Sequence, residues 1–259
     1  FLFYQGNRDA VEELARLGQG FLRSRGDSLT ASRREVLGAL LSLSRWWTRP
    51  ESAEAFEMAM QAEEASRRTG NAELSILSHL VLARIHLDRG QFEESRRILG
   101  ETEELITRNP GCGLYEASLR FYLGDAHFYL GDLERALEQV LEGQRRSSPG
   151  FPFHAYLRLN QALYLLYRPS AVDVEAAAEI LAALGETRIA ENLYVRYYSV
   201  YLLRMLLAYR RGSRDEALYY CRRLQTPESR PLLQSDYPYG YLALAETLLE
   251  FGELQSALQ

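Results

Sequence analysis

Residues 123–141 read LGDAHFYLGDLERALEQVL, an apolar segment, a Gly-Asp pair and a segment with a regular apolar pattern. After the Gly-Asp pair, apolar residues recur at 133, 136, 137, 140 and 141, which is the spacing of one helix face. The segment before the pair, residues 114–130, is apolar nearly all round, as expected for a helix packed on several sides. The stretch predicts two consecutive helices, the first buried and the second at the surface.

The same pattern recurs along the chain, because a glycine follows an apolar segment and precedes an acidic one at four places. Gly90, Gly131, Gly212 and Gly252 are separated by 41, 81 and 40 residues. The double interval predicts a further turn near residue 171, and counting back from Gly90 predicts turns near 50 and 6. We therefore expect residues 1–259 to form a single all-α domain of about six and a half repeats, with turns near 6, 50, 90, 131, 171, 212 and 252.

Charge placement supports antiparallel helix pairs with these boundaries. In the best-defined second helix, Asp132 and Glu134 come first and Arg145 and Arg146 come last, an order that favours the helix dipole at both ends. Neither end of the chain carries a convincing polar capping repeat, which helical solenoids need. We therefore expect the chain to be part of a longer protein.

Composition narrows the class of protein. Hydrophobic residues make up 47% and charged residues 25%, which argues against disorder. All 30 basic residues are Arg, against 35 acidic residues, and a net charge of −5 favours neither nucleic acid nor an anionic membrane as a partner. The most apolar stretch, residues 193–209, is interrupted by Arg196 and Arg204, and the two cysteines lie far apart. A cytoplasmic protein is the expectation.

The repeat resembles the tetratricopeptide repeat family, most closely in Leu123-Gly124, Gly131-Asp132-Leu133 and Ala136. The family's small residue before the turn has counterparts at Ala83, Gly124 and Ala245, and its alanine after the turn has counterparts at Ala136, Ala217 and Ala257. Ser95 and Met205 depart from the pattern. HEAT-like repeats share a period near 40 residues but do not explain this signature.

A period near 40 exceeds the usual tetratricopeptide length of about 34 residues. In this respect the chain is similar to the repeat domains of bacterial signalling regulators such as the maltotriose-responsive transcription activator. The resemblance implies a right-handed superhelical solenoid whose first helices line a concave groove, where a ligand is expected to lie.

Residues six and two positions before each turn should face that groove. They are mostly polar although their helices are apolar, and this placement calls for a reason. One interpretation is that these residues are polar because a wide groove is exposed to solvent. The other is that they form a mixed-charge groove for a peptide or a partner helix. The predicted partner-binding residues are Arg84, Asp88, Asp125, Tyr129, Arg210, Glu246 and Glu250, with Leu206 in the same register.

Aromatic residues form a second candidate, because tyrosines are concentrated between residues 194 and 241. Tyr237 and Tyr239 flank Pro238 at a helix entrance and are expected to be exposed contacts. Tyr201, Tyr219 and Tyr220 lie on periodic apolar faces, so helix packing is the favoured interpretation for them.

Neither a metal site nor a catalytic site is predicted. His86 and His127 occupy equivalent positions in neighbouring repeats, where packed helices stand roughly 8–10 Å apart, too far for ligands of one metal ion unless the rings converge. No phosphate loop or recognisable nucleophile is present, so we expect no enzyme and no cofactor.

Two functions remain open from the sequence. The first is a scaffold that binds a protein or peptide on its concave face; the alternative is an effector-sensing domain of a larger signalling ATPase or transcription regulator. A purely structural spacer is a third possibility. The oligomeric state is not predicted.

Overall fold

The computed structural model describes residues 53–149, 152–185, 201–225 and 238–253, with isolated residues between 13 and 38. The expected turns near residues 6 and 50 lie outside the described residues. Within these ranges every regular element is a helix, which confirms the all-α prediction for this part of the chain. The elements are α3 (Ala53–Thr69), α4 (Ala72–Asp88), α5 (Phe92–Arg108), the 3-10 helix η3 (Pro110–Tyr115), α6 (Glu116–Tyr129), α7 (Leu133–Arg146), α8 (Pro152–Tyr167), α9 (Ala171–Gly185), α11 (Leu203–Arg210), α12 (Arg214–Leu224) and α14 (Pro238–Glu250).

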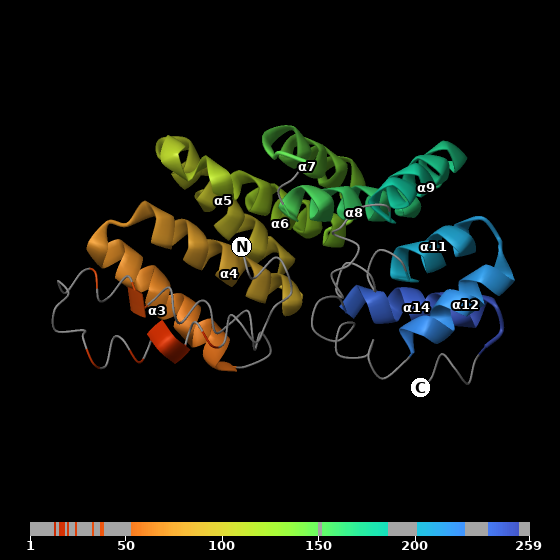
Figure 1. Cartoon of the computed structure of the whole chain (residues 1–259), viewed down its shortest axis with the longest axis horizontal. Helices are drawn as coiled ribbons and strands as arrows, with labels where there is room; N and C mark the ends of the chain where they lie inside the picture. Colours follow the sequence, from red (N-terminus) through yellow and green to blue (C-terminus); the bar gives the residue numbers. More distant parts are fainter. Residues whose placement is uncertain are drawn as a thin grey trace.

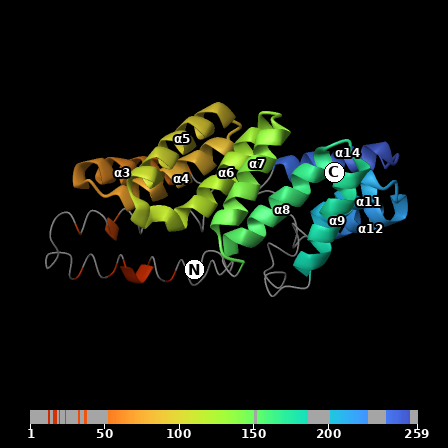
Figure 2. The ribbon, with the colours of Figure 1, turned by 90° about the horizontal axis from the view of Figure 1, so that it is seen from above.

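Successive helices pack against their neighbours in sequence and follow one another along an arc, from α3 at one end to α12 and α14 at the other (Figure 1). The view from above shows the same order, with α6, α7 and α8 side by side in the middle (Figure 2). The helices before the predicted turns also contact one another directly, α4 with α6, α6 with α8, and α8 with α11. Side chains from consecutive first helices are therefore brought onto one shared face.

Glycine supports the turns because its backbone adopts positive φ without steric cost. Gly131 has φ 82°, and its N–H and that of Asp132 donate to the carbonyls of Phe128 and His127, which closes the end of α6. The Asp132 side chain then accepts from the Arg135 N–H and caps α7. Gly90, Gly212 and Gly252 also have positive φ between or after helices.

Two connections depart from that glycine pattern. Near residue 171, α8 ends at Tyr167 and α9 begins at Ala171, so Arg168–Ser170 makes the turn without glycine. Between α3 and α4, Gly70 has φ 64°, and the repeat period did not predict this turn. Gly70 joins a second helix to the next first helix, whereas Asn109 and the 3-10 helix η3 make the corresponding connection after α5.

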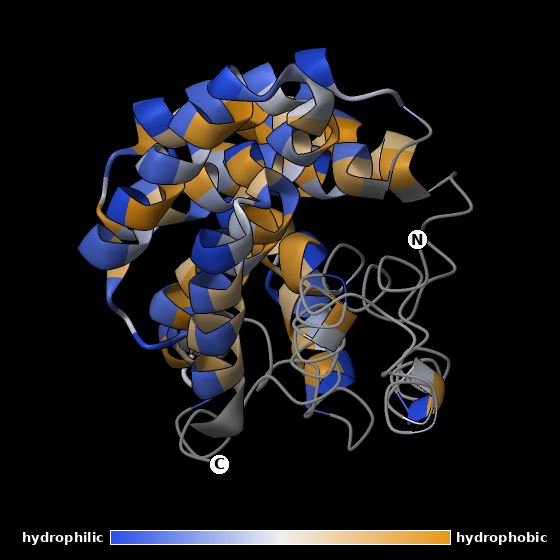
Figure 3. Cartoon of the chain, turned by 90° about the vertical axis from the view of Figure 1, so that its left-hand side faces the viewer, coloured by the Kyte–Doolittle hydropathy of each residue, from blue (hydrophilic) through white to orange (hydrophobic). Residues whose placement is uncertain are grey.

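Burial differs between the two kinds of helix as the sequence predicts. α4 and α6 are buried along most of their length, whereas α7 buries only Ala136, Leu137, Val140 and Gly143. Hydrophilic residues lie mainly along the outer sides of the helices (Figure 3). The first helices therefore supply most of the buried side chains. A site on the face that these helices share would be lined by their side chains.

Small residues let the helices approach closely. A Cβ atom on Gly124 would lie 2.9 Å from Val140 Cγ1 of α7, a distance that real Cβ contacts avoid. Ala83 and Ala136 are fully buried. Ser95 stands at the position that is Ala136 in the next repeat; its hydroxyl donates to the Ala83 carbonyl at 2.8 Å, so the buried hydroxyl has an acceptor on the paired helix.

Candidate binding site on the first helices

Four of the predicted groove residues lie on the two adjacent first helices. Arg84 and Asp88 are one turn apart on α4, and Asp125 and Tyr129 are one turn apart on α6. Arg84 Nε donates to Asp88 Oδ1 at 2.8 Å, which the four-residue spacing on a helix permits. Arg84 is only 9% exposed, while Asp88 lies at the surface.

Asp125 is buried against α8. It is 2% exposed, and its Oδ1 accepts hydrogen bonds from Asn160 Nδ2 at 2.7 Å and from the Tyr164 hydroxyl at 2.9 Å. Asn160 Nδ2 also donates to the Tyr164 hydroxyl at 3.0 Å. These bonds join α6 to α8, and we call Arg84, Asp88, Asp125, Asn160 and Tyr164 the polar cluster.

The surroundings of Asp125 change its acidity. Burial raises the pKa of Asp125 from 3.8 to about 7, because a buried carboxylate loses its hydration. The positive charge of Arg84 and the hydrogen bonds from Tyr164 and Asn160 act in the opposite direction without cancelling the effect of burial. Burial likewise raises the pKa of Tyr129, whose ring stacks on Phe92 at 4.8 Å between centroids.

One polar atom of this cluster is left without a partner. Asn160 is fully buried, and its Oδ1 receives no hydrogen bond, while its Nδ2 donates twice. A buried acceptor without a donor costs free energy, roughly 1–3 kcal/mol. The cluster is therefore short of one donor.

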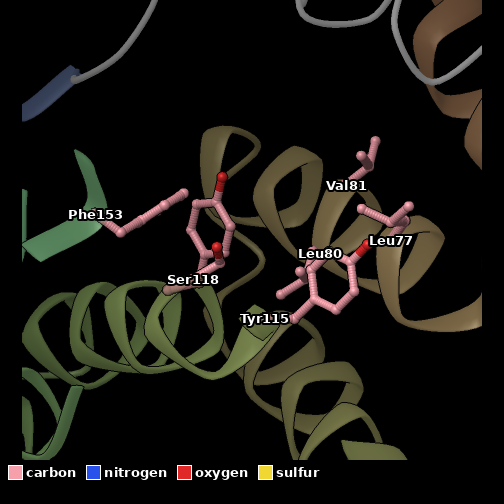
Figure 4. A pocket seen from close by; sticks show the side chains of 7 residues that line it. Leu77, Leu80, Val81, Tyr115, Ser118 and Phe153 are labelled. Carbon is pink, nitrogen blue, oxygen red and sulfur yellow. The ribbon is translucent and has the colours of Figure 1, made fainter. Parts of the chain in front are cut away.

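An apolar pocket of ≈ 40 Å³ lies on the same three helices. Side chains from α4, from η3 and α6, and from α8 point into a shared space (Figure 4). The pocket and the polar cluster share helix faces, because Val81 is one turn before Arg84 and Tyr122 is one turn before Asp125. The lining residues are Leu77, Leu80, Val81, Tyr115, Ser118, Tyr122 and Phe153.

The exposed row expected from the sequence is interrupted. Arg84 and Asp125 were expected to face a partner directly, but the structure buries both, and each has a hydrogen-bonding partner within the protein. Arg210 is half-buried and donates to the Arg168 carbonyl at 2.7 Å, beyond the end of α8. Alanine at Arg84, Asp125 and Arg210 would remove these contacts, so we expect the triple change to lower the stability of the protein.

The remaining members of the row differ in accessibility. Leu206 is buried, whereas Glu246 and Glu250 on α14 are exposed. Tyr239 lies in the first turn of α14, and Tyr237 lies outside the described residues.

The tyrosines near the far end of the arc divide into two groups. Tyr201 and Tyr220 are half-buried against the core, with ring centroids 6.2 Å apart, as predicted for packing residues. Tyr219 is 49% exposed with the Arg223 guanidinium 5.6 Å from its ring centroid, so the packing prediction is wrong for Tyr219. Its position on α12 faces outward, between apolar positions that face the core.

The histidines and carboxylates of the described residues do not gather into a metal site. In the described parts of the chain, no group of three or more His, Cys, Asp or Glu residues is placed to hold a metal ion. His86 Nδ1 instead lies 2.6 Å from Gln91 Oε1, and His79 lies within 3.8 Å of Glu63. The described helices include none with the length and apolar character needed to cross a membrane.

Sequence reasoning missed Asn160, Tyr164 and the apolar pocket. Asn160 is a polar residue inside the apolar run of α8, and that contrast was a usable signal. Comparison with known proteins adds no family to this picture, since no family model and no curated protein matches the chain.

Proposed function

We propose that the chain is a tetratricopeptide-like helical-repeat scaffold that binds a protein or peptide segment on the face formed by its first helices. The alternation of buried and amphipathic helices and the glycine turns about 40 residues apart support the repeat class. A superhelical solenoid is the architecture that this proposal assumes.

The observation that carries the proposal is the apolar pocket beside the polar cluster. Three consecutive first helices supply its walls, as they would in a repeat scaffold whose shared face holds a ligand. A hollow of ≈ 40 Å³ suits one aliphatic side chain. It is much smaller than the roughly 300–1,000 Å³ of small-molecule pockets, which favours a polypeptide over an effector at this place.

Charge indicates which polypeptide would fit. The clearly exposed members of the predicted row are Asp88, Glu246 and Glu250, and all three are acidic. The two arginines of the row are already engaged, Arg84 with Asp88 and Arg210 with a backbone carbonyl. A segment with an aliphatic side chain and basic neighbours is therefore the partner that complements this face.

Binding of defined peptides tests this proposal. We would titrate short fluorescein-labelled peptides with a central leucine flanked by arginine, serine or glutamate, and follow anisotropy. The arginine peptide is expected to bind most tightly. In Leu77→Trp the larger side chain is expected to fill the pocket and abolish binding, whereas Leu141→Trp, on the exposed side of α7, should bind as the parent does.

Two checks accompany the peptide titration. Circular dichroism melts of both variants establish that loss of binding does not come from loss of folding. Equal affinity for the three peptides, or an unchanged affinity in folded Leu77→Trp, would contradict the proposed site.

A further inference from the structure

Asp125 interacts with polar groups of two neighbouring helices, α8 and α4. On α8, Asn160 and Tyr164 offer it uncharged donors. On α4, the guanidinium of Arg84 attracts its negative charge but donates to Asp88 instead. The carboxyl is buried, so the cost of holding a charge there is high.

The unpaired Asn160 Oδ1 indicates which form of Asp125 fits the cluster best. A carboxylate offers only acceptors and cannot satisfy this oxygen. A protonated carboxyl has one O–H donor, and a carboxylic acid and a primary amide can pair through two opposed hydrogen bonds. Protonation of Asp125 supplies the donor that the buried amide lacks.

We propose that Asp125 is a proton-operated switch in the candidate site. With the proton bound, the carboxyl pairs with the Asn160 amide in both directions and leaves Arg84 on Asp88. When the proton leaves to solvent, the carboxylate draws Arg84 toward itself and away from Asp88. The proton is the only group exchanged, and no bond between heavy atoms forms or breaks.

The groups around Asp125 are consistent with this switch. From α4, Arg84 and Asp88 act on it with opposite signs, and from α8 it meets Asn160 and Tyr164. On its own helix, the titratable neighbours of Asp125 are Tyr122, His127 and Tyr129. Burial keeps the Tyr129 hydroxyl protonated and lowers the pKa of His127. From α7, Ala136 and Val140 lie against Gly124, and from α5, Phe92 stacks on Tyr129. The charged groups of these two helices nearest to this part of α6 act on His127: Arg96, Asp132, Arg135 and Glu138.

The switch changes the charge of the exposed face. With Asp125 protonated, Arg84 pairs with Asp88; with Asp125 ionised, the same guanidinium is attracted by both carboxylates, and the site gains one negative charge. This consequence rests on the proposed function, because it concerns a basic partner. Such a partner is expected to bind more tightly above neutral pH and to release a proton when it binds at lower pH.

NMR of isotope-labelled carboxyl carbons tests the switch without any partner. The Asp125 signal, assigned by its absence in Asp125→Asn, should titrate near pH 7. The Asn160 side-chain amide and the Arg84 Nε–H should shift with the same midpoint, and both shifts should vanish in Asp125→Asn. A titration midpoint of Asp125 near its ordinary value of 3.8 would overturn the proposal. Asn160 chemical shifts that do not change while Asp125 titrates would overturn it as well.

Substitutions of Asp88 and Arg84 should shift the titration midpoint of Asp125 in opposite directions. Asp88→Asn removes a like charge and frees Arg84, so the Asp125 midpoint should fall to lower pH. Arg84→Gln removes the attracting cation, so the midpoint should rise. Glu179→Gln, an exposed change on α9, should leave it in place. Shifts of the same sign in the first two variants would contradict competition for Arg84.

Peptide binding then separates the switch from the proposed function. For the parent, affinity for the arginine peptide should increase several-fold from about pH 6 to about pH 8, and Asp125→Asn should lose most of that increase. Absence of peptide binding at every pH would reject the proposed partner, while the carboxyl titration decides the switch by itself.

Discussion

The Tyr164 hydroxyl lies 3.2 Å from the position that a Cβ atom on Gly124 would occupy, and it donates to the adjacent residue, Asp125. The missing side chain at Gly124 therefore makes room for the bond that joins α6 to α8. A small residue required for helix packing and a polar contact of the candidate site thus depend on the same close approach.

Gly124→Ala is expected to destabilise the protein by about 1–3 kcal/mol, because the new Cβ meets Val140 and the Tyr164 hydroxyl in a packed interior. Gly100→Ala in α5 is the matched control, since a Cβ there meets open space. The control should stabilise by roughly 0.5–1 kcal/mol through helix propensity alone. Urea unfolding of both variants measures the difference, and equal effects would refute the close approach.

Tyr164→Phe should lower the free energy of unfolding by about 1 kcal/mol, since Asp125 and Asn160 both lose a hydrogen-bonding partner. The pKa of Asp125 should rise further, because the lost hydrogen bond favours the charged form. Tyr219→Phe, at an exposed ring, should change neither quantity appreciably. Chemical denaturation and the carboxyl titration check the two effects separately.

The pH dependence of stability should carry a contribution of known sign from Asp125. Its pKa is raised in the folded protein from 3.8 to about 7, so the folded state holds the proton more tightly than the unfolded chain. This contribution is fully present below about pH 4 and is lost as pH rises through about 7. The free energy of unfolding should therefore fall across that interval relative to Asp125→Asn.

The comparison with Asp125→Asn is necessary because the histidines act in the opposite sense. Burial lowers the pKa of His79, His127 and His154, so the unfolded chain binds their protons more tightly and stability rises with pH through their range. These terms are shared by parent and variant and cancel in the difference. A difference that is constant from about pH 4 to about pH 8 would disprove the Asp125 contribution.

The helices and their turns could be predicted because each depends on local sequence. A turn glycine such as Gly131 is marked by its own residue type and by the acid that caps the next helix. The regular spacing also gave Arg84 and Asp125 equivalent positions, six residues before Gly90 and Gly131. Gly70 was not predicted, because the glycine pattern marks the turn within each pair of helices and Gly70 joins one pair to the next.

The interior of the site could not be predicted because it depends on neighbours distant in sequence. Whether Asp125 is exposed or buried is decided by Asn160 and Tyr164, which lie more than thirty positions later, at separations of 35 and 39 residues. Periodicity locates a residue on a helix face without stating what covers that face. The pocket likewise requires side chains from three helices at once.

The surface contacts of the arginines that precede the turns also depend on residues distant in sequence. Arg89, Arg168 and Arg211 occupy equivalent positions, and each reaches the preceding second helix: Arg89 lies over Phe56, Arg168 pairs with Glu134 and Arg211 with Glu175. Arg211→Gln should nonetheless cost only about 0–1 kcal/mol, because both members of its pair are exposed to solvent. A thermal melt at low and high salt checks this, and a larger, salt-independent loss would assign these arginines a greater role.

Glu246 and Glu250 provide a test of charge complementarity that leaves the core untouched. Both side chains are exposed on α14, so Glu246→Gln with Glu250→Gln should preserve the melting temperature. The affinity for the arginine peptide should fall at low ionic strength, and the difference from the parent should shrink as salt screens the remaining charges. Glu179→Gln carries one such change on α9, outside the first-helix face, and should bind as the parent does. If the double variant binds as tightly as the parent at low salt, Glu246 and Glu250 do not contribute to partner binding. The pocket and the polar cluster on α4, α6 and α8 must then account for binding alone.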